Sequence, residues 1–165
     1  MERYSAFAFA TARDLFEAAR EASRDAERIR RQLEAMEQRT LSLGGGGFEP
    51  RVSSTPTGGT MERRVGALID MEGRLRERQE DDYALLDLAS RVLYGDDSGS
   101  GLWALVGWRA DAIYHHYIDD LKWAVVANML GYSETHVWQQ VQVAFDVCDG
   151  WGVPNVIAGV GAAQE

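Results

Sequence analysis

Polar side chains that can form paired hydrogen bonds are concentrated between residues 133 and 142. Gln139 and Gln142 each carry an amide with acceptor and donor groups, a pattern that can bind the edge of an adenine bidentately. Thr135 offers a methyl group that can contact a thymine methyl. Trp138 can stack on a base or a sugar, or anchor a protein partner. The chemistry expected of this segment is recognition by contact.

Other residues with chemical potential lack the partners that catalysis or metal binding needs. His115 and His116 are adjacent, so on a helix their side chains point about 100° apart and cannot easily hold one metal ion. Asp119 and Asp120 follow in a turn, where acidic side chains most often form a solvated cap.

The single cysteine, Cys148, has no histidine partner close in sequence, and the glycine run at 44–47 lacks the Gly-Lys-Ser/Thr ending of a phosphate-binding loop. No Ser/His/Asp, paired-carboxylate or cofactor signature is present. We therefore expect a protein that is not an enzyme and that binds no metal and no cofactor.

Apolar residues around the polar segment have the spacing of two helices joined by a tight turn. Residues 126–130 give one short apolar face, and 137–144 give a second at i, i+4 and i+7. Between them, Gly131 can adopt the positive φ that ends a helix, and Ser133 is a good N-cap for the next one. This is the layout of a helix-turn-helix. Its expected core positions are Val126, Ala127, Leu130, Gly131, Val137 and Val141.

Upstream residues extend the pattern. An apolar helix from 108 is followed by a Tyr-Ile-Asp-Asp-Leu turn at 117–121 and by the first helix of the motif. Thirteen residues of this stretch stand at matching positions of a known motif: Tyr117, Ile118, Asp119, Leu121, Trp123, Val126, Ala127, Leu130, Gly131, Tyr132, Ser133, His136 and Val137. The motif is "Y-I-D-G-L-S-W-x-x-V-A-x-x-L-G-Y-S-x-x-H-V", the core of the phage transcriptional regulators of the ArpU type. The order of elements thus resembles sigma-factor region four, and especially these regulators.

The resemblance covers roughly 40 of the 165 residues. It implies a regulator that binds double-stranded DNA at a promoter or phage regulatory site, with RNA polymerase as a further candidate partner. The residues expected to face DNA are Lys122, Ser133, Glu134, Thr135, Trp138, Gln139 and Gln142.

Charge departs from the family pattern. From residue 96 onward, nine acidic residues accompany two basic ones, Arg109 and Lys122. Because phosphate neutralisation supplies most DNA affinity, two alternatives stay open. One is a module that kept the fold and now contacts protein. The other is a DNA-packaging protein similar to a small terminase subunit, which joins a helix-turn-helix to long helices and assembles into rings.

The N-terminal half must position this motif, and its apolar residues repeat in alternating steps of four and three. The seam consists of Ala8, Ala12, Leu15, Ala19, Ala22, Ala26, Ile29, Leu33 and Met36. A second stripe consists of Met61, Val65, Leu68, Leu75, Leu86, Ala89 and Leu93, interrupted by Glu72, Gln79 and Asp82. We expect the two to pair as an antiparallel hairpin within one chain, or alternatively between two chains.

Composition predicts an all-α protein, and the apolar spacing predicts a long N-terminal helical hairpin or coiled coil. The resemblance implies that a sigma-region-four-like helix-turn-helix domain follows it. Only three prolines occur, the net charge is −9, and one cysteine cannot form an internal disulfide. We expect a cytoplasmic homodimer without membrane contact. The expected segments are a heptad helix at 1–42, a Gly-rich linker at 43–60, a second long helix at 61–95, a linker at 96–101, the helix-turn-helix domain at 102–150 and a coil tail at 151–165.

Overall fold

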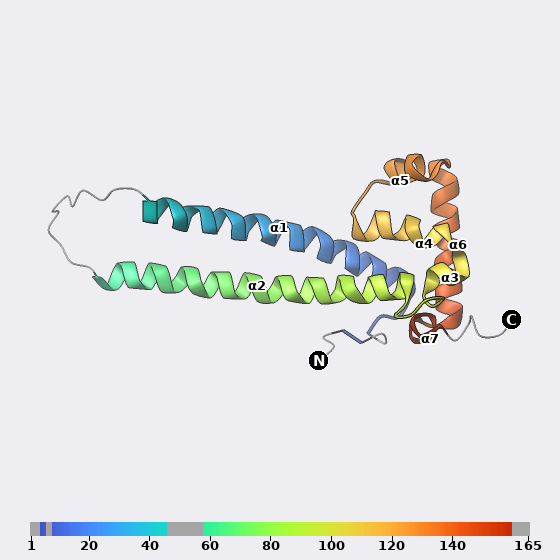
Figure 1. Cartoon of the computed structure of the whole chain (residues 1–165), viewed down its shortest axis with the longest axis horizontal. Helices are drawn as coiled ribbons and strands as arrows, with labels where there is room; N and C mark the ends of the chain where they lie inside the picture. The colour runs from blue at the N-terminus through green and yellow to red at the C-terminus, as the bar shows by residue number, and fades with distance from the viewer. Residues whose placement is uncertain (1–3, 6–7, 46–57, 160–165) are drawn as a thin grey trace.

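The computed structural model describes residues 4–5, 8–45 and 58–159, and in these ranges every regular element is helical. The prediction of an all-α chain is confirmed. Two long helices form a hairpin that projects from a group of shorter helices (Figure 1). The elements are α1 (Ala12–Gly45), α2 (Gly58–Tyr94), α3 (Leu102–Val106), α4 (Trp108–Ile113), the π-helical turn η1 (Tyr114–Ile118), α5 (Trp123–Leu130), α6 (Glu134–Trp151) and α7 (Val153–Ala158).

Helices α1 and α2 run side by side in opposite directions (Figure 1). The α1 side of their contact is the predicted heptad seam, in which six side chains are at most 5% exposed: Ala12, Leu15, Ala19, Ala22, Ala26 and Ile29. From α2, Leu85, Leu88, Ala89 and Val92 are buried in one cluster with the first four of these residues. The hairpin is thus formed within one chain, and the small alanine side chains allow its helices to approach closely.

The first helix begins later than expected. Residues 8–11 are not helical, and Ala8 is exposed and outside the seam. Thr11 ends the irregular segment, because its hydroxyl accepts a hydrogen bond from the Asp14 amide at 3.1 Å and donates one to the Asp14 carboxylate at 2.8 Å. This reciprocal pairing is a helix N-cap, so helix 1–42 is corrected to Ala12–Gly45.

Packing weakens toward the tip of the hairpin. Every described side chain from 62 to 71 on α2 is exposed, including Val65 at 49% and Leu68 at 48%. On α1, Leu33 and Met36 are only half-buried. The stripe on α2 is therefore buried at its Ala89 end and open at its other end; the side chain of Met61 lies outside the described set.

Polar side chains interrupt the seam midway along the hairpin. Arg78 on α2 lies 2.6 Å from the Asp25 carboxylate on α1. Asp82 lies beside Asp25, and among the described residues its buried Oδ2 atom has no hydrogen-bond partner. Burial, and next the Asp25 carboxylate, raise the pKa of Asp82 to about 6. Asp82, one of the three polar residues predicted to interrupt the stripe, thus has a buried oxygen atom without a hydrogen-bond donor among the described residues.

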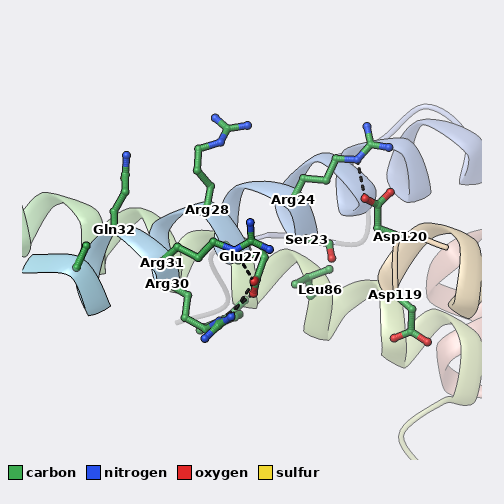
Figure 2. A pocket seen from close by; sticks show the side chains of 13 residues that line it. Ser23, Arg24, Glu27, Arg28, Arg30, Arg31, Gln32, Leu86, Asp119 and Asp120 are labelled. Carbon is green, nitrogen blue, oxygen red and sulfur yellow. Dashed lines mark hydrogen bonds and ion pairs between the residues drawn. The ribbon is translucent and has the colours of Figure 1, made fainter. Parts of the chain in front are cut away.

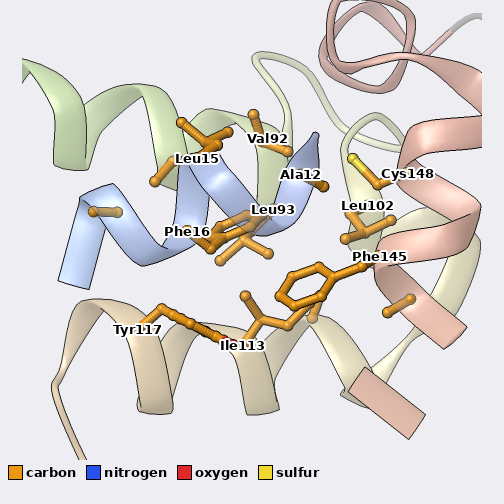
Figure 3. Packing of buried hydrophobic residues seen from close by; sticks show 14 of the residues in the cluster. Ala12, Leu15, Phe16, Val92, Leu93, Leu102, Ile113, Tyr117, Phe145 and Cys148 are labelled. Atoms are coloured by element: carbon orange, nitrogen blue, oxygen red, sulfur yellow. The ribbon is translucent and has the colours of Figure 1, made fainter. Parts of the chain in front are cut away.

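One apolar cluster joins the base of the hairpin to the shorter helices. Phe16 of α1 stacks on Phe145 of α6 with ring centroids 5.7 Å apart and lies 6.1 Å from Tyr117 of η1 (Figure 3). Leu102 of α3 and Ile113 of α4 are fully buried in the same cluster. The elements that carry the candidate interface are therefore packed directly on the hairpin.

Residues 95–101 connect the hairpin to α3 as a tight loop. A Cβ at Gly95 would lie 1.8 Å from the Ser100 hydroxyl oxygen, so this close approach requires glycine. The Gly101 amide donates to the carbonyl of Val156 in α7 at 2.9 Å. The loop is thus packed against the C-terminal helix.

The predicted tail at 151–165 is wrong as a coil where the structure describes it. Helix α6 continues through Trp151, and Val153–Ala158 form α7. Pro154 fits the first turn of that helix, where no amide donor is needed, and Val156 and Ile157 are buried. Burial stabilises a helix too short to form alone. Residues 46–57 of the predicted linker and 160–165 of the predicted tail lie outside the described ranges. None of the described helices is long and apolar enough to cross a membrane.

Candidate nucleic-acid interface

A tight turn joins α5 to α6. Gly131 has φ 76° and ψ 27°, in the left-handed region that favours glycine. The amides of Gly131 and Tyr132 donate to the carbonyls of Asn128 and Ala127, at 3.4 and 3.1 Å. This pair of bonds is a Schellman motif, which ends α5. Ser133 then caps α6 and accepts a hydrogen bond from the His136 amide at 3.3 Å.

Helices α5 and α6 pack against each other through the residues that the apolar spacing selects. Val126, Val137 and Val141 are fully buried, Ala127 is 3% exposed and Leu130 is half-buried. This packed helix pair lies at the end of the molecule away from the hairpin tip (Figure 1).

The side chains predicted to face DNA are divided between the start of α5 and helix α6 with its cap. Lys122 is exposed at the N-cap of α5, where its carbonyl accepts from the Val125 amide at 2.9 Å. Glu134 and Thr135 are exposed in the first turn of α6, and Gln139 is exposed one turn later. Trp138 is 48% exposed.

Gln142 differs from these residues because it has a partner from the hairpin. The Arg13 guanidinium of α1 donates through Nη2 to the Gln142 side-chain oxygen. The Gln142 side-chain nitrogen donates to the Trp138 carbonyl at 3.4 Å. Both ends of the amide are thus engaged, which restricts the freedom of this side chain to bind a base.

Aromatic side chains stack beside the turn that joins α5 to α6. Trp108 of α4 stacks on Tyr132 with ring centroids 4.6 Å apart, and on His136 at 6.0 Å. Arg109 donates to the Gln140 side chain at 2.7 Å, so one of the two basic residues of this half is already held by α6. These contacts tie α4 to the first turns of α6.

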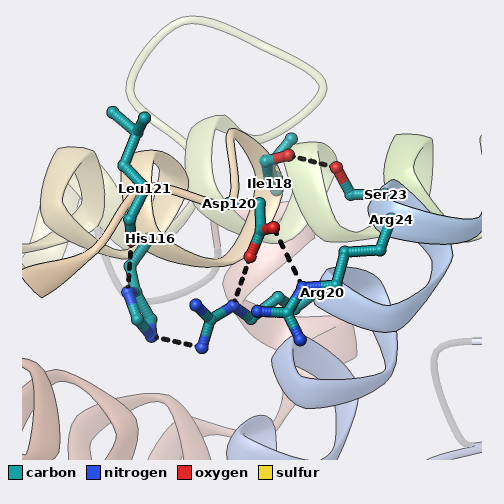
Figure 4. Close-up of polar contacts among 7 residues, drawn as sticks. All are labelled: Arg20, Ser23, Arg24, His116, Ile118, Asp120 and Leu121. Carbon is teal, nitrogen blue, oxygen red and sulfur yellow. Dashed lines mark hydrogen bonds and ion pairs between the residues drawn. The ribbon is translucent and has the colours of Figure 1, made fainter. Parts of the chain in front are cut away.

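The loop before α5 is anchored to the hairpin. Asp120 lies 2.7 Å from Arg20 Nε and 2.9 Å from Arg24 Nε (Figure 4). The hydrogen bond from Arg24, assisted by Arg20, holds the pKa of Asp120 below its usual range. Asp120 adopts φ 55°, a left-handed conformation that aspartate tolerates better than most residues. Ser23 adds a hydrogen bond to the Ile118 carbonyl at 2.6 Å.

His116 connects the same loop to α1 (Figure 4). Its Nδ1 lies 2.7 Å from the Leu121 carbonyl and its Nε2 lies 3.0 Å from Arg20 Nη1. Burial lowers the pKa of His116 to about 4, so the ring is neutral at pH 7. Neutral imidazole can donate at Nδ1 and accept at Nε2, as these contacts require. The ring also stacks on Trp123, the first residue of α5, at 3.7 Å.

An open groove of about 830 Å³ runs beside this anchor, lined mainly by the middle of α1 (Figure 2). Its charges largely pair with one another. Glu27 binds Arg30 and Arg31 at 2.7 and 3.0 Å, and these bonds lower the pKa of the Glu27 carboxyl to about 2. Because the arginines are paired in this way, the groove offers little free positive charge to an anion.

Sequence reasoning missed the arginines that α1 brings to the interface. Arg13, Arg20 and Arg24 recur at steps of seven and four, which places them along one face of a helix. That stripe was visible in the sequence, but its docking beside α5 and α6 was not. Among the described residues, no group of three His, Cys, Asp or Glu side chains could hold a metal ion.

The arrangement can bind a surface by shape, hydrogen bonding and stacking. No protein-family model, no curated protein and no solved structure matches this chain. The resemblance to the ArpU-type regulators stays a prediction, which depends on residues 117–137.

Proposed function

We propose that the chain is a phage- or prophage-type transcriptional regulator that binds double-stranded DNA by placing α6 in the major groove. The observation that supports this most is the outer face of α6, where Thr135 and Gln139 are exposed on a helix fixed by a tight turn. A helix presenting such side chains on its first turns fits the major groove, where bases differ in their donors and acceptors.

The hairpin gives this proposal its second element. It packs on η1 and α6 near the interface and leaves the outer face of α6 open (Figure 1). We infer that it serves for dimerisation or for contact with RNA polymerase in the cytoplasm. Tethering of that kind adds effective concentration, which an acidic helix-turn-helix needs for useful affinity.

A protein-contact function is the second candidate. Val125, Met129 and Trp138 are 45%, 54% and 48% exposed, and exposed apolar side chains often mark protein interfaces. A packaging function is a further alternative, and the oligomeric state separates it from the regulator. A monomer or dimer in solution favours a regulator, whereas a closed ring favours packaging.

The test compares Glu134→Lys with the parent in binding to a pool of random-sequence duplexes at low and high salt. Glu134 occupies the first turn of α6, where a carboxylate would face phosphates. We expect roughly fivefold tighter binding, equivalent to about 1 kcal/mol. The matched control is Glu37→Lys, which makes the same charge change at an exposed site on the far part of α1.

Under the protein-contact alternative, no duplex binds, Glu134→Lys has no effect, and Trp138→Ala abolishes capture of a protein partner. Absence of binding to any duplex by the parent, even at low salt, would overturn the DNA-binding proposal. Loss of sequence preference in Gln139→Ala, with overall affinity largely retained, would identify Gln139 as a base-reading residue.

A further inference from the structure

Arg13 lies where the hairpin meets the candidate interface. It is the second residue of α1, its side chain is exposed, and its Nη2 donates to the Gln142 side chain in the middle of α6. The Arg13 Cζ atom also lies 5.8 Å from the centre of the Phe145 ring. Two residues one helical turn apart on α6 therefore position this guanidinium.

The backbone that carries Arg13 is fixed as well. The Ala12 amide donates to the Asp149 carboxylate of α6 at 2.7 Å. Thr11 caps the same turn of α1 through the Asp14 amide. The start of α1 is thus attached to α6 at Ala12, and its first turn is capped by Thr11, so the backbone that carries Arg13 is held beside α6.

Other arginines near the interface are held by carboxylates. Arg20 and Arg24 share the carboxylate of Asp120 within 2.9 Å, so one of their two positive charges is compensated and both side chains are held at the loop before α5. Arg13 instead binds the uncharged amide of Gln142 and a ring face. A guanidinium has five N–H donors, and the contact with Gln142 uses one of them.

We propose that Arg13 contacts a DNA phosphate at the edge of the major groove and that Gln142 is its positioning residue. The inference rests on the proposed DNA binding by α6. An α-helix with side chains is about 10–12 Å across and the major groove is about 12 Å wide, so α6 would fill the groove. A group beside the third turn of α6 then lies over the bordering sugar–phosphate strand. Arginine is well suited to that contact, because its planar donors match phosphate oxygens.

The assignment changes the role expected of Gln142. Its oxygen orients Arg13, and its nitrogen is directed to the Trp138 carbonyl. Gln142 therefore acts through Arg13, whereas Gln139 keeps a free outer face for base recognition.

The experiment measures fluorescence anisotropy of a labelled random-sequence duplex over a range of KCl concentrations, with the full chain and with Arg13→Ala. The slope of log K against log salt should become shallower by about one unit, because each phosphate contact contributes about −0.9. Sequence preference should not change. The matched control, Arg39→Ala, removes the same charge from an exposed site on the far part of α1 and should leave the slope as in the parent.

Four further variants separate positioning from charge. Arg13→Lys should keep the parental slope, and Arg13→Gln should lose it, because only the first keeps the charge. Gln142→Ala should weaken binding less than Arg13→Ala, and the double variant should bind no worse than Arg13→Ala alone. Equal melting temperatures of all variants show that the fold is retained.

The results distinguish the two proposals. If the parent binds duplex DNA and Arg13→Ala behaves like Arg39→Ala, the phosphate assignment is overturned while DNA binding stands. A changed sequence preference in Arg13→Ala would also overturn it, because the residue would then read bases. If the parent binds no duplex, both proposals fail.

Discussion

Replacing Asp82 with asparagine should stabilise the protein at neutral pH. The Asp82 carboxyl lies between α1 and α2, its Oδ2 is buried without a partner among the described residues, and its neighbour is the Asp25 carboxylate. An asparagine amide has nearly the same shape as a protonated carboxyl and can donate to Asp25. The charged groups around it are Glu21, Arg24, Asp25 and Arg28 on α1 and Arg78 and Asp81 on α2.

The size of the effect follows from the pKa of Asp82. A rise from 3.8 to about 6 corresponds to about 3 kcal/mol, and solvent screening of this partly exposed group reduces it to about 1–2 kcal/mol. Because the pKa is higher in the folded state, the destabilisation is absent below pH 3.8 and grows as pH rises to about 6. It then stays constant. Asp82→Asn should therefore match the parent near pH 3.5 and exceed it at pH 7.

Thermal unfolding of both proteins at a series of pH values tests this reasoning. The variant should melt about 2–8 °C above the parent at pH 7. Asp87→Asn makes the same charge change at an exposed site of the same helix and should show no such gain. Equal melting of Asp82→Asn and parent at pH 7, or a gain that persists undiminished below pH 4, would show that the buried carboxyl does not limit stability.

Three further changes test other parts of the fold. Ala127→Leu should force α5 and α6 apart and cost about 1–3 kcal/mol in unfolding free energy, measured by urea denaturation; parental stability would mean that the helices do not pack at this point. Gly131→Val should cost a similar amount, because a β-branched residue resists φ 76°. The Cβ atom of a residue at this position would meet nothing within 4 Å, so the expected cost comes from the backbone conformation alone. A variant as stable as the parent would show that the turn is not left-handed. Asp120→Asn should lower the free energy of unfolding by about 1 kcal/mol at pH 7. The difference from the parent should disappear as pH falls through the depressed pKa of the Asp120 carboxyl. A difference that does not depend on pH would exclude ion pairing as its cause. The Cys148 thiol is fully buried and burial raises its pKa to about 12, so a thiol reagent should label it only as fast as the protein unfolds; rapid labelling of folded protein would contradict its place in the core.

Local patterns in the sequence predicted local structure well. The step of four and three from Ala12 to Ile29 identified a buried helical face, because that period persists whenever two helices pack along their length. Gly131 and Ser133 marked the turn between α5 and α6, because a left-handed glycine and a capping serine have specific backbone roles. Such signals depend only on near neighbours in the chain.

Contacts between distant segments were not predictable in this way. The bond between Arg13 and Gln142 joins residues 129 positions apart, and nothing in either neighbourhood indicates the other. Helix α7 was missed because its glycine-flanked sequence has little intrinsic helix propensity and depends on the burial of Val156 and Ile157. The candidate site was therefore predicted on α6, but not on α1, which places Arg13 beside it.

The exposed outer part of the hairpin sets a gradient of local stability along the molecule. Backbone amides exchange with solvent through openings whose free energy depends on the apolar surface exposed. Separating the two helices between residues 62 and 71 would expose almost no buried side chains, whereas separating them at Ala89 or Leu93 would open the central apolar cluster. Local opening of the two long helices should therefore begin at residues 62–71 and proceed in steps toward the base of the hairpin, where the helices stay packed. A ligand that binds α2 at residues 62–71 would suppress this local opening, and its binding would be detectable as slower amide exchange in a part of the chain far from α6.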